Sequence, residues 1–187
     1  MIDLSILVPY IRRHESAFLK LKFKLSAQIL PYAGRIELLT DNHEYDLVGT
    51  KRNRLLERAT GKYLCFFDAD DTPSHDYIDQ LMKAVESDCD CASLRGEYSV
   101  DGVFDGVFEH SLKYDKWATV KGEIKYIRTP NHLNMCRSSI AKVFKFPDTN
   151  FGEDADWSSQ IFQAGALKTE HYIDDIIYYY DYETNKK

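Results

Sequence analysis

Short apolar runs alternate with longer amphipathic stretches through the first half of the chain. Three runs, Leu4–Val8, Ile36–Leu39 and Tyr63–Phe67, are mostly apolar and end at turn signals, a pattern typical of strands buried on both faces. Helical patterns follow the first two runs, over residues 18–29 and 51–59, and another follows the third. Strand-then-helix units in this order predict a mostly parallel sheet with right-handed crossovers and helices on both faces.

The pattern becomes less regular in the second half. Residues 96–128 alternate weakly around two glycines, which indicates hairpins. Helices are predicted over residues 138–144 and 153–164, followed by a closing strand over 173–182 and a frayed tail to the last residue. We therefore expect one α/β domain over residues 1–187, with a more irregular, partly antiparallel second half.

Composition agrees with a globular domain. The 187 residues are 44% hydrophobic and 29% charged, and the formal net charge of −6 argues against a broad nucleic-acid surface. Basic side chains nevertheless gather near the start of the chain, at Arg12, Arg13, Lys20, Lys22 and Lys24. With no run of transmembrane length and no secretory signal, the expected location is the cytoplasm, of a cell or of a virus-infected host. The four cysteines lack the spacing of a zinc site and are expected to be reduced packing residues.

Three carboxylates stand where the third predicted strand ends: Asp68, Asp70 and Asp71. The carboxyl ends of the strands are where open α/β sheets bind their ligands. Crowded carboxylates repel one another, and a divalent cation with a bound phosphate relieves that repulsion. The alternative is that the acids form a turn and lead into a helix opened by Thr72-Pro73. The spacing agrees with both interpretations.

Polar residues at the other strand ends belong to the same expected crevice. Tyr10 follows the first strand and Asp41 the second, and neighbouring parallel strands bring these ends together. Lys51 and Arg52 begin the next helix, where cations and free amides suit a phosphate. A solvated basic helix face is the alternative for these two residues.

A second acidic pair lies in the first turn of the helix predicted from residue 153. Glu153 and Asp154 follow Gly152 in the sequence. The helix macrodipole alone favours acids at this position. A carboxylate held by a rigid helix, behind a glycine that allows close approach of a substrate, also suits a general base.

Taken in order, these motifs resemble those of a known family. Six segments resemble the motifs of a nucleotide-sugar glycosyltransferase of the GT-A fold, closest to glycosyltransferase family two: Ser5–Tyr10, Leu38–Asn42, Gly49–Asn53, Ala59–Tyr63, Phe66–Asp71 and Gly152–Trp157. The fifth segment carries the family's Asp-x-Asp motif. The second departs from the family pattern, because a threonine stands where the first of two aspartates is usual.

The resemblance implies a role for each matching residue. Residues 1–95 would form the half that binds the nucleotide sugar and the metal, and residues 96–187 the half that binds the acceptor and carries the base. Contacts with the nucleoside or the diphosphate would come from Tyr10, Glu15, Asp41, Lys51 and Arg52. Asp68 would lie against the ribose or the sugar, and Asp70 would bind the Mn²⁺ or Mg²⁺ that bridges the diphosphate.

On the acceptor side, Asp154 would be the base that deprotonates the acceptor hydroxyl, and Glu153 would position the donor or the acceptor. Many GT-A enzymes add a metal-binding histidine near the C-terminus. His171 lies before the last predicted strand and matches that position poorly. His132 precedes the base motif and is a further candidate for the acceptor pocket or the metal.

The activity that the resemblance implies is metal-dependent transfer of a hexosyl or pentosyl unit, with inversion, from a nucleoside diphosphate sugar to a hydroxyl acceptor. Family habit favours uridine diphosphate sugars, and the acceptor stays open among a glycan, a lipid-linked sugar, a protein and a modified nucleobase. A sugar nucleotidyltransferase is one alternative, but such enzymes usually have a glycine-rich loop where this chain has Pro9–Arg13. A non-catalytic nucleotide-sugar-binding module is another, and the intact carboxylates in both motifs count against it.

Overall fold

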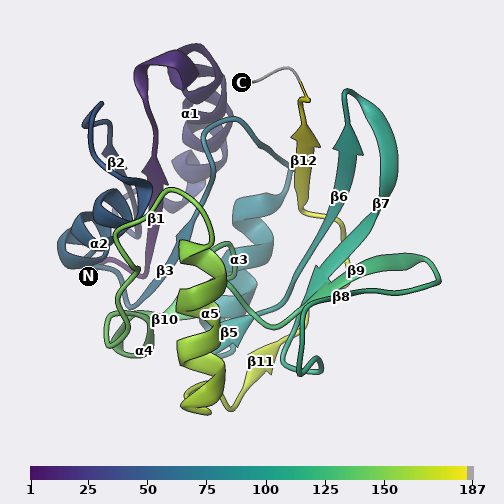
Figure 1. The fold of residues 1–187 in the computed structure, drawn as a ribbon. Helices are drawn as coiled ribbons and strands as arrows, with labels where there is room; N and C mark the ends of the chain where they lie inside the picture. Colours follow the sequence, from purple (N-terminus) through teal and green to yellow (C-terminus); the bar gives the residue numbers. More distant parts are fainter. Residues whose placement is uncertain (185–187) are drawn as a thin grey trace.

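The computed structural model describes residues 1–184 and contains two six-stranded sheets (Figure 1). The first sheet has the order β11-β5-β10-β3-β1-β2. In it β1, β2 and β3 run parallel, and the short β10 is antiparallel to both of its neighbours. The strands of this sheet are β1 (Leu4–Pro9), β2 (Ile36–Asp41), β3 (Tyr63–Phe66), β5 (Cys91–Ala92), β10 (Cys136–Arg137) and β11 (Glu170–His171).

The second sheet is mixed and has the order β4-β12-β6-β7-β9-β8. β6 and β7 form an antiparallel hairpin, while β12 runs parallel to β6 and β9 parallel to β7. Its strands are β4 (Thr72–Pro73), β6 (Leu94–Val100), β7 (Val103–His110), β8 (Ala118–Thr119), β9 (Ile124–Arg128) and β12 (Tyr178–Tyr182). The prediction of a parallel first half and a partly antiparallel second half is confirmed.

Helices cover both faces of the first sheet. α1 and α3 pack against one face, and α2, α4 and α5 pack against the other. The helices are α1 (Glu15–Ile29), α2 (Val48–Arg58), α3 (Tyr77–Glu86), α4 (Ser138–Ala141) and α5 (Glu153–Gln163), with 3₁₀ turns η1 (Arg12–His14) and η2 (Leu30–Tyr32). Among residues 1–184, no helix combines the length and the apolar character that crossing a membrane requires.

The central strands are apolar on both sides because each side meets helices. Ile6 and Cys65 belong to the core cluster that contains α1 and α3, whereas Leu7 and Leu64 belong to the cluster that contains α2 and α5. Successive side chains of a strand point to opposite faces, so a strand covered on both faces needs an uninterrupted apolar run. All four cysteines are buried free thiols, as predicted.

The order β3-β1-β2 gives the first sheet a point where its connections diverge. From β1 the chain passes through α1 to β2 on one side, whereas β3 lies on the other side of β1 and leads through α3 toward β5. The loops after β1 and β3 therefore leave toward opposite edges of the sheet, and such switch points are where open α/β sheets bind ligands.

One predicted helix start is wrong. Thr72-Pro73 forms β4, which pairs antiparallel with Tyr178 and Tyr179 of β12, and α3 begins only at Tyr77. Pairing with a strand from the far end of the chain outweighs a local helix-start signal, as tertiary contacts commonly do.

The closing strand and the tail also differ from the prediction. The strand begins at Tyr178 rather than at residue 173, because Ile173 is hydrogen-bonded to Ser93 before the strand starts. Of the predicted frayed tail, Thr184 is hydrogen-bonded to Asp101, and residues 185–187 lie outside the described part of the chain.

Candidate active site

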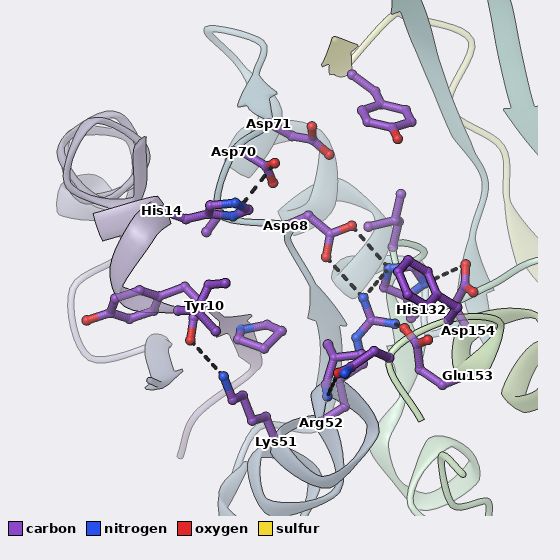
Figure 2. Close-up of a pocket in the computed structure, with 18 of the residues that line it drawn as sticks. Tyr10, His14, Lys51, Arg52, Asp68, Asp70, Asp71, His132, Glu153 and Asp154 are labelled. Atoms are coloured by element: carbon purple, nitrogen blue, oxygen red, sulfur yellow. Dashed lines mark hydrogen bonds and ion pairs between the residues drawn. The ribbon is translucent and has the colours of Figure 1, made fainter. Parts of the chain in front are cut away.

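A cavity of about 900 Å³ lies at the carboxyl ends of β1 and β3, between the two sheets. This volume is in the upper part of the range for small-molecule sites. One wall comes from the loops after β1 and β3 and from α2, and the other from β6, β7, β9, β12 and the start of α5. Figure 2 shows its charged residues, which come from segments far apart in the sequence.

A buried arginine joins two of the acidic motifs. Arg52, in α2, donates to Oε1 of Glu153 at 2.6 Å and to Oδ1 of Asp68 at 3.1 Å. Its guanidinium also lies over the rings of Phe66 and Phe146, 5.7 and 5.5 Å from their centroids. A buried charge is tolerated only with partners of opposite charge, because desolvation is costly. Arg52 thus ties the end of β3 to the start of α5.

We expect Arg52→Met to lower the free energy of unfolding by about 3–5 kcal/mol, because breaking a buried ion pair leaves its partners uncompensated. The matched control is Arg58→Met in the same helix, where the side chain is exposed and donates to a backbone carbonyl. Urea unfolding of both variants measures the difference. Equal losses from the two substitutions would contradict the structural role of Arg52.

His132 lies between Asp68 and Asp154. Its Nε2 is 3.1 Å from Nη2 of Arg52 and 3.5 Å from Oδ2 of Asp68. A guanidinium nitrogen can only donate, so Nε2 of His132 is the acceptor in the shorter contact and the ring proton resides on Nδ1. Within the described residues Nδ1 is buried without a hydrogen-bond partner, 3.8 Å from Oδ2 of Asp154. The ring therefore presents an N–H to that carboxylate.

The two acids at the start of α5 face different surroundings. The helix begins after Gly152, whose φ of +78° lies in the left-handed region that glycine adopts without strain. Glu153 is buried against Arg52, whereas the side chain of Asp154 is 25% exposed and lines the cavity. The positive end of the helix dipole favours both carboxylates. One acid is therefore ion-paired and the other is open to a ligand.

The carboxylates after β3 also divide their roles. Burial by itself raises the pKa of Asp68, but the positive charge and the hydrogen bond of Arg52 outweigh burial and hold the pKa below its ordinary value. Asp71 is buried and accepts a hydrogen bond of 2.6 Å from the hydroxyl of Tyr178.

Asp70 lines the cavity beside a histidine from the first loop. Its Oδ2 lies 3.8 Å from Nδ1 of His14, which ends η1 directly after β1 (Figure 2). The two residues come from the two loops that diverge at the switch point. Asp70 is therefore the acid of the Asp-x-Asp motif that is best placed to meet a ligand.

The donor set at this end fits a cation that is shared with a diphosphate. Within residues 1–184, no group of three His, Cys, Asp or Glu side chains is placed to hold a metal ion. In phosphate sites Mg²⁺ is commonly held by one or two carboxylates, and substrate phosphates and water complete its shell. Asp70 lines the cavity beside His14, and it would be the carboxylate of such a shell.

Tyr10 and Lys51 line the cavity on the side of β1. The buried Nζ of Lys51 donates to the carbonyl oxygen of Tyr10 at 3.1 Å, and burial lowers the pKa of this lysine. The ring of Tyr10 stacks on Phe18 with a centroid distance of 4.1 Å and an interplanar angle of 11°. These contacts fix the positions of a cation and an aromatic ring on this side of the cavity.

Three candidates from the sequence are not among the residues that line the cavity. Glu15 is exposed at the start of α1, and His171 lies in β11 at the far edge of the first sheet. The carboxylate of Asp41 is 1% exposed and accepts hydrogen bonds of 2.7 and 3.1 Å from Arg54. Asp41 ends the edge strand β2, and its carboxylate faces α2 rather than the cavity. The order of the strand ends in the sequence does not show this orientation.

The pKa of Asp41 gives a pH-dependent prediction. Burial raises this pKa, but hydrogen bonds from Arg54 and His43 outweigh burial and bring it to about 2. Because the pKa is lower in the folded state, the ionised carboxylate stabilises the fold above about pH 4, and this contribution disappears as the pH falls toward 2. We expect Asp41→Asn to be less stable than the wild type at pH 7, with a difference that shrinks below pH 4. Urea unfolding across this range measures it, and a difference independent of pH would contradict the linkage.

The structure adds cavity residues that the sequence did not single out: His14, Tyr98, His110, Tyr126, Arg128 and Tyr180. The sequence contains a signal for His14, because this residue lies in the loop after the first strand, where ligand-binding residues are expected. The others belong to strands of the second sheet, and only long-range pairing brings them to the cavity.

The fold and the site together define a class of protein. The mixed α/β arrangement, with helices on both faces of the first sheet and a second sheet beside it, is that of the GT-A glycosyltransferase fold, as predicted. A comparison with protein families matches residues 25–148 to "Glycosyl transferase family 2". The match spans more than half of the chain, and the chain belongs to this family.

Solved structures share the fold. The S. aureus TarS fragment 1–349 matches with a TM-score of 0.66 and 16% identity, and its complex with UDP-GlcNAc with a TM-score of 0.69 and 17% identity. The matches cover 96% of this chain and 60% and 58% of the fragment, so this chain spans less than two thirds of the neighbour's length. At such identity the likeness establishes the fold. A comparison with curated proteins found no match.

Proposed function

We propose that this chain transfers a sugar from a nucleoside diphosphate sugar to a hydroxyl acceptor, with inversion and with the help of Mn²⁺ or Mg²⁺. The observation that carries the proposal is the placement of two carboxylates in one cavity. Asp70 lies beside His14 and Asp154 beside His132, with Asp68 between these pairs (Figure 2). One bound substrate could therefore meet Asp70, which would help to neutralise the leaving group, and Asp154, which would act as the base.

The donor would occupy the side of the cavity at β1 and β3. The ring of Tyr10 offers a rigid surface for the nucleoside, and the buried Lys51 places a positive charge nearby. Asp70 would hold the divalent cation, with His14 beside it. Such a cation would neutralise negative charge on the departing diphosphate.

Asp154 would accept the proton of the attacking hydroxyl. In the transfer, the acceptor oxygen bonds to the anomeric carbon, the bond from that carbon to the diphosphate oxygen breaks, and the hydroxyl proton passes to Asp154. An in-line displacement of this kind inverts the configuration. The N–H of His132 faces the Asp154 carboxylate and would hold its orientation during the proton transfer.

The buried hydrogen-bond network of Arg52, Asp68 and Glu153 would keep the groups that contact the substrate in their relative positions. Arg52 binds both Asp68 and Glu153 and so links the loop after β3 to the start of α5. Catalytic groups need supporting contacts of this kind, because small displacements reduce rates strongly. Glu153 and Arg52 therefore act as positioning residues in the proposal.

Family membership favours glycosyl transfer over the nucleotidyltransferase alternative. The TarS fragment was crystallised with UDP-GlcNAc and with UDP, which makes these the first compounds to test here. A thermal-shift series with UDP, UDP-GlcNAc and other nucleotide sugars, each with and without Mn²⁺, tests donor binding, since a ligand of the native state raises the melting temperature. We expect uridine compounds to raise it more with Mn²⁺ than without. No shift from any nucleotide sugar would count against the proposal.

A further inference from the structure

The second sheet turns an aromatic face toward the cavity. Strand register places Tyr180 of β12 beside Tyr98 of β6, and Phe108 of β7 beside Tyr126 of β9. Arg128 continues the same face two residues further along β9, because side chains alternate along a strand. All five residues line the cavity that also contains Asp154. This wall lies across the cavity from the strand ends assigned above to the donor.

Three tyrosines of this wall form a trough. The ring centroid of Tyr98 is 5.3 Å from that of Tyr180 and 5.4 Å from that of Tyr126, at interplanar angles of 51° and 82°. The hydroxyl of Tyr126 is hydrogen-bonded to Asp105, which fixes its ring. Rings tilted in this way provide no pair of parallel faces between which a planar base would stack. Tilted aromatic rings that line a cavity and carry hydroxyl groups suit a puckered sugar ring, which has C–H faces and hydroxyls around its rim.

Arg128 adds a charge to the trough. Its guanidinium lies 4.5 Å from the ring centroid of Trp117, and Nε1 of Trp117 donates to Oγ1 of Thr129 at 3.0 Å. Among residues 1–184, the guanidinium makes no hydrogen bond or ion pair. Burial lowers the pKa of Arg128, and Asp154 acts on it through space in the opposite direction. A half-buried cation that forms no ion pair or hydrogen bond within residues 1–184 is only partly compensated by the more distant Asp154, and an anionic group on a ligand would offset the remaining cost.

We propose that the tyrosine trough and Arg128 form the acceptor subsite, and that the acceptor is a sugar ring that carries a carboxylate or a phosphate. The proposal rests on the proposed function, because it places the acceptor hydroxyl next to Asp154. The ring packs on Tyr98 and Tyr180, and the anionic group pairs with Arg128. A single cation in this wall fits one anionic group, whereas a nucleic acid backbone needs several phosphate contacts.

Binding of small probes to the whole chain tests this subsite without a known donor. Saturation-transfer NMR would compare methyl β-glucuronide, glucose 6-phosphate, methyl β-glucoside and thymidine. We expect each anionic sugar to bind roughly tenfold more tightly than the glucoside, because hydrogen bonds to charged groups are stronger than neutral ones. The tighter of the two anionic probes identifies the anion as a carboxylate or a phosphate. Equal binding of the glucoside and both anionic sugars, or a preference for thymidine, would overturn the proposal.

Variants separate the ring contact from the charge contact. Tyr180→Ala should abolish detectable binding of all three sugars. Its matched control is Tyr179→Ala, because Tyr179 is adjacent, is 38% exposed compared with 39% for Tyr180, and does not line the cavity. Equal loss of sugar binding in both tyrosine variants would contradict the trough.

Arg128→Gln should remove the preference for the anionic sugars while the glucoside still binds, and a retained preference would exclude Arg128 as its source. Arg128→Lys keeps the charge and should keep part of the preference, which covers the case in which the glutamine variant does not fold. Binding of UDP to the wild type separates this inference from the proposed function. A protein that binds UDP but no anionic sugar overturns the subsite alone, whereas a protein that binds no nucleotide sugar overturns the proposed function.

Discussion

Asp154→Asn is expected to lose sugar transfer while it keeps the donor affinity of the wild type. The substitution preserves the size of the side chain and removes its capacity to take a proton. General bases contribute about 10²–10⁴-fold to rates, so we expect kcat to fall by that factor. The dissociation constant for the nucleotide sugar should stay within about twofold, because Asp154 lies beside His132, whereas Asp70 lies beside His14.

The control for this variant is Asp156→Asn, two residues further along α5. Asp156 is exposed, accepts a hydrogen bond from Gln160 and does not line the cavity. Its substitution removes the same charge from the same helix terminus, so it reports the electrostatic effect of the helix alone. Wild-type turnover from Asp154→Asn, or an equal loss in both variants, would remove Asp154 from the mechanism.

Asp70→Asn is expected to abolish the dependence of donor binding on the divalent cation. Loss of even an outer partner of a metal ligand typically costs 10–100-fold in metal affinity, so loss of the carboxylate itself should cost at least about tenfold. Titration calorimetry with UDP in Mn²⁺ and in a chelator measures the effect. The wild type should bind more tightly with the metal, and the variant should bind equally under both conditions.

The neighbouring Asp71→Asn variant tests the division of roles among the carboxylates that follow β3. Asp71 is buried with Tyr178, so its substitution should lower the melting temperature and leave the benefit of Mn²⁺ for UDP binding in place. A metal effect that survives in Asp70→Asn but is lost in Asp71→Asn would reverse the assignment.

Local patterns were enough to predict the first half of the fold. The apolar runs at residues 4–8, 36–39 and 63–67 became parallel strands because helices cover both of their faces. The positions of Asp70 and Asp154 could also be predicted from local patterns, because strand ends and helix starts are local features of the sequence. What their position means for binding and catalysis stays a prediction.

Tertiary partners were harder to predict than positions. The expected contact of Arg52 with the donor stays a prediction, and the structure adds that its guanidinium lies between Glu153 and Asp68, residues from two distant segments. The expected contact of Asp41 with the nucleoside is likewise untested, and the structure adds that Arg54 and His43 bind its carboxylate. In each case the sequence shows a charged residue at the right element, and only packing decides which opposite charge it meets.

The second sheet was the least predictable part. The alternation of apolar and polar residues in this part of the sequence is weak. Its strands also pair over long separations in the chain, β12 with β6 and β7 with β9. No local signal places Tyr98, Tyr126 and Tyr180 on one wall, or Arg128 beside Asp154. Register between distant strands creates this face of the cavity.

Sugar transfer is tested most directly by phosphorus NMR of the whole chain incubated with UDP-GlcNAc and other UDP-sugars, with Mn²⁺ and with a chelator. We expect UDP to appear from one of these donors when Mn²⁺ is present, and its release to slow strongly in the chelator and in Asp154→Asn. Formation of pyrophosphate instead of UDP would point to nucleotidyl transfer. Donors that bind but stay intact under all conditions, with the anionic sugars present as acceptors, would contradict catalysis of sugar transfer.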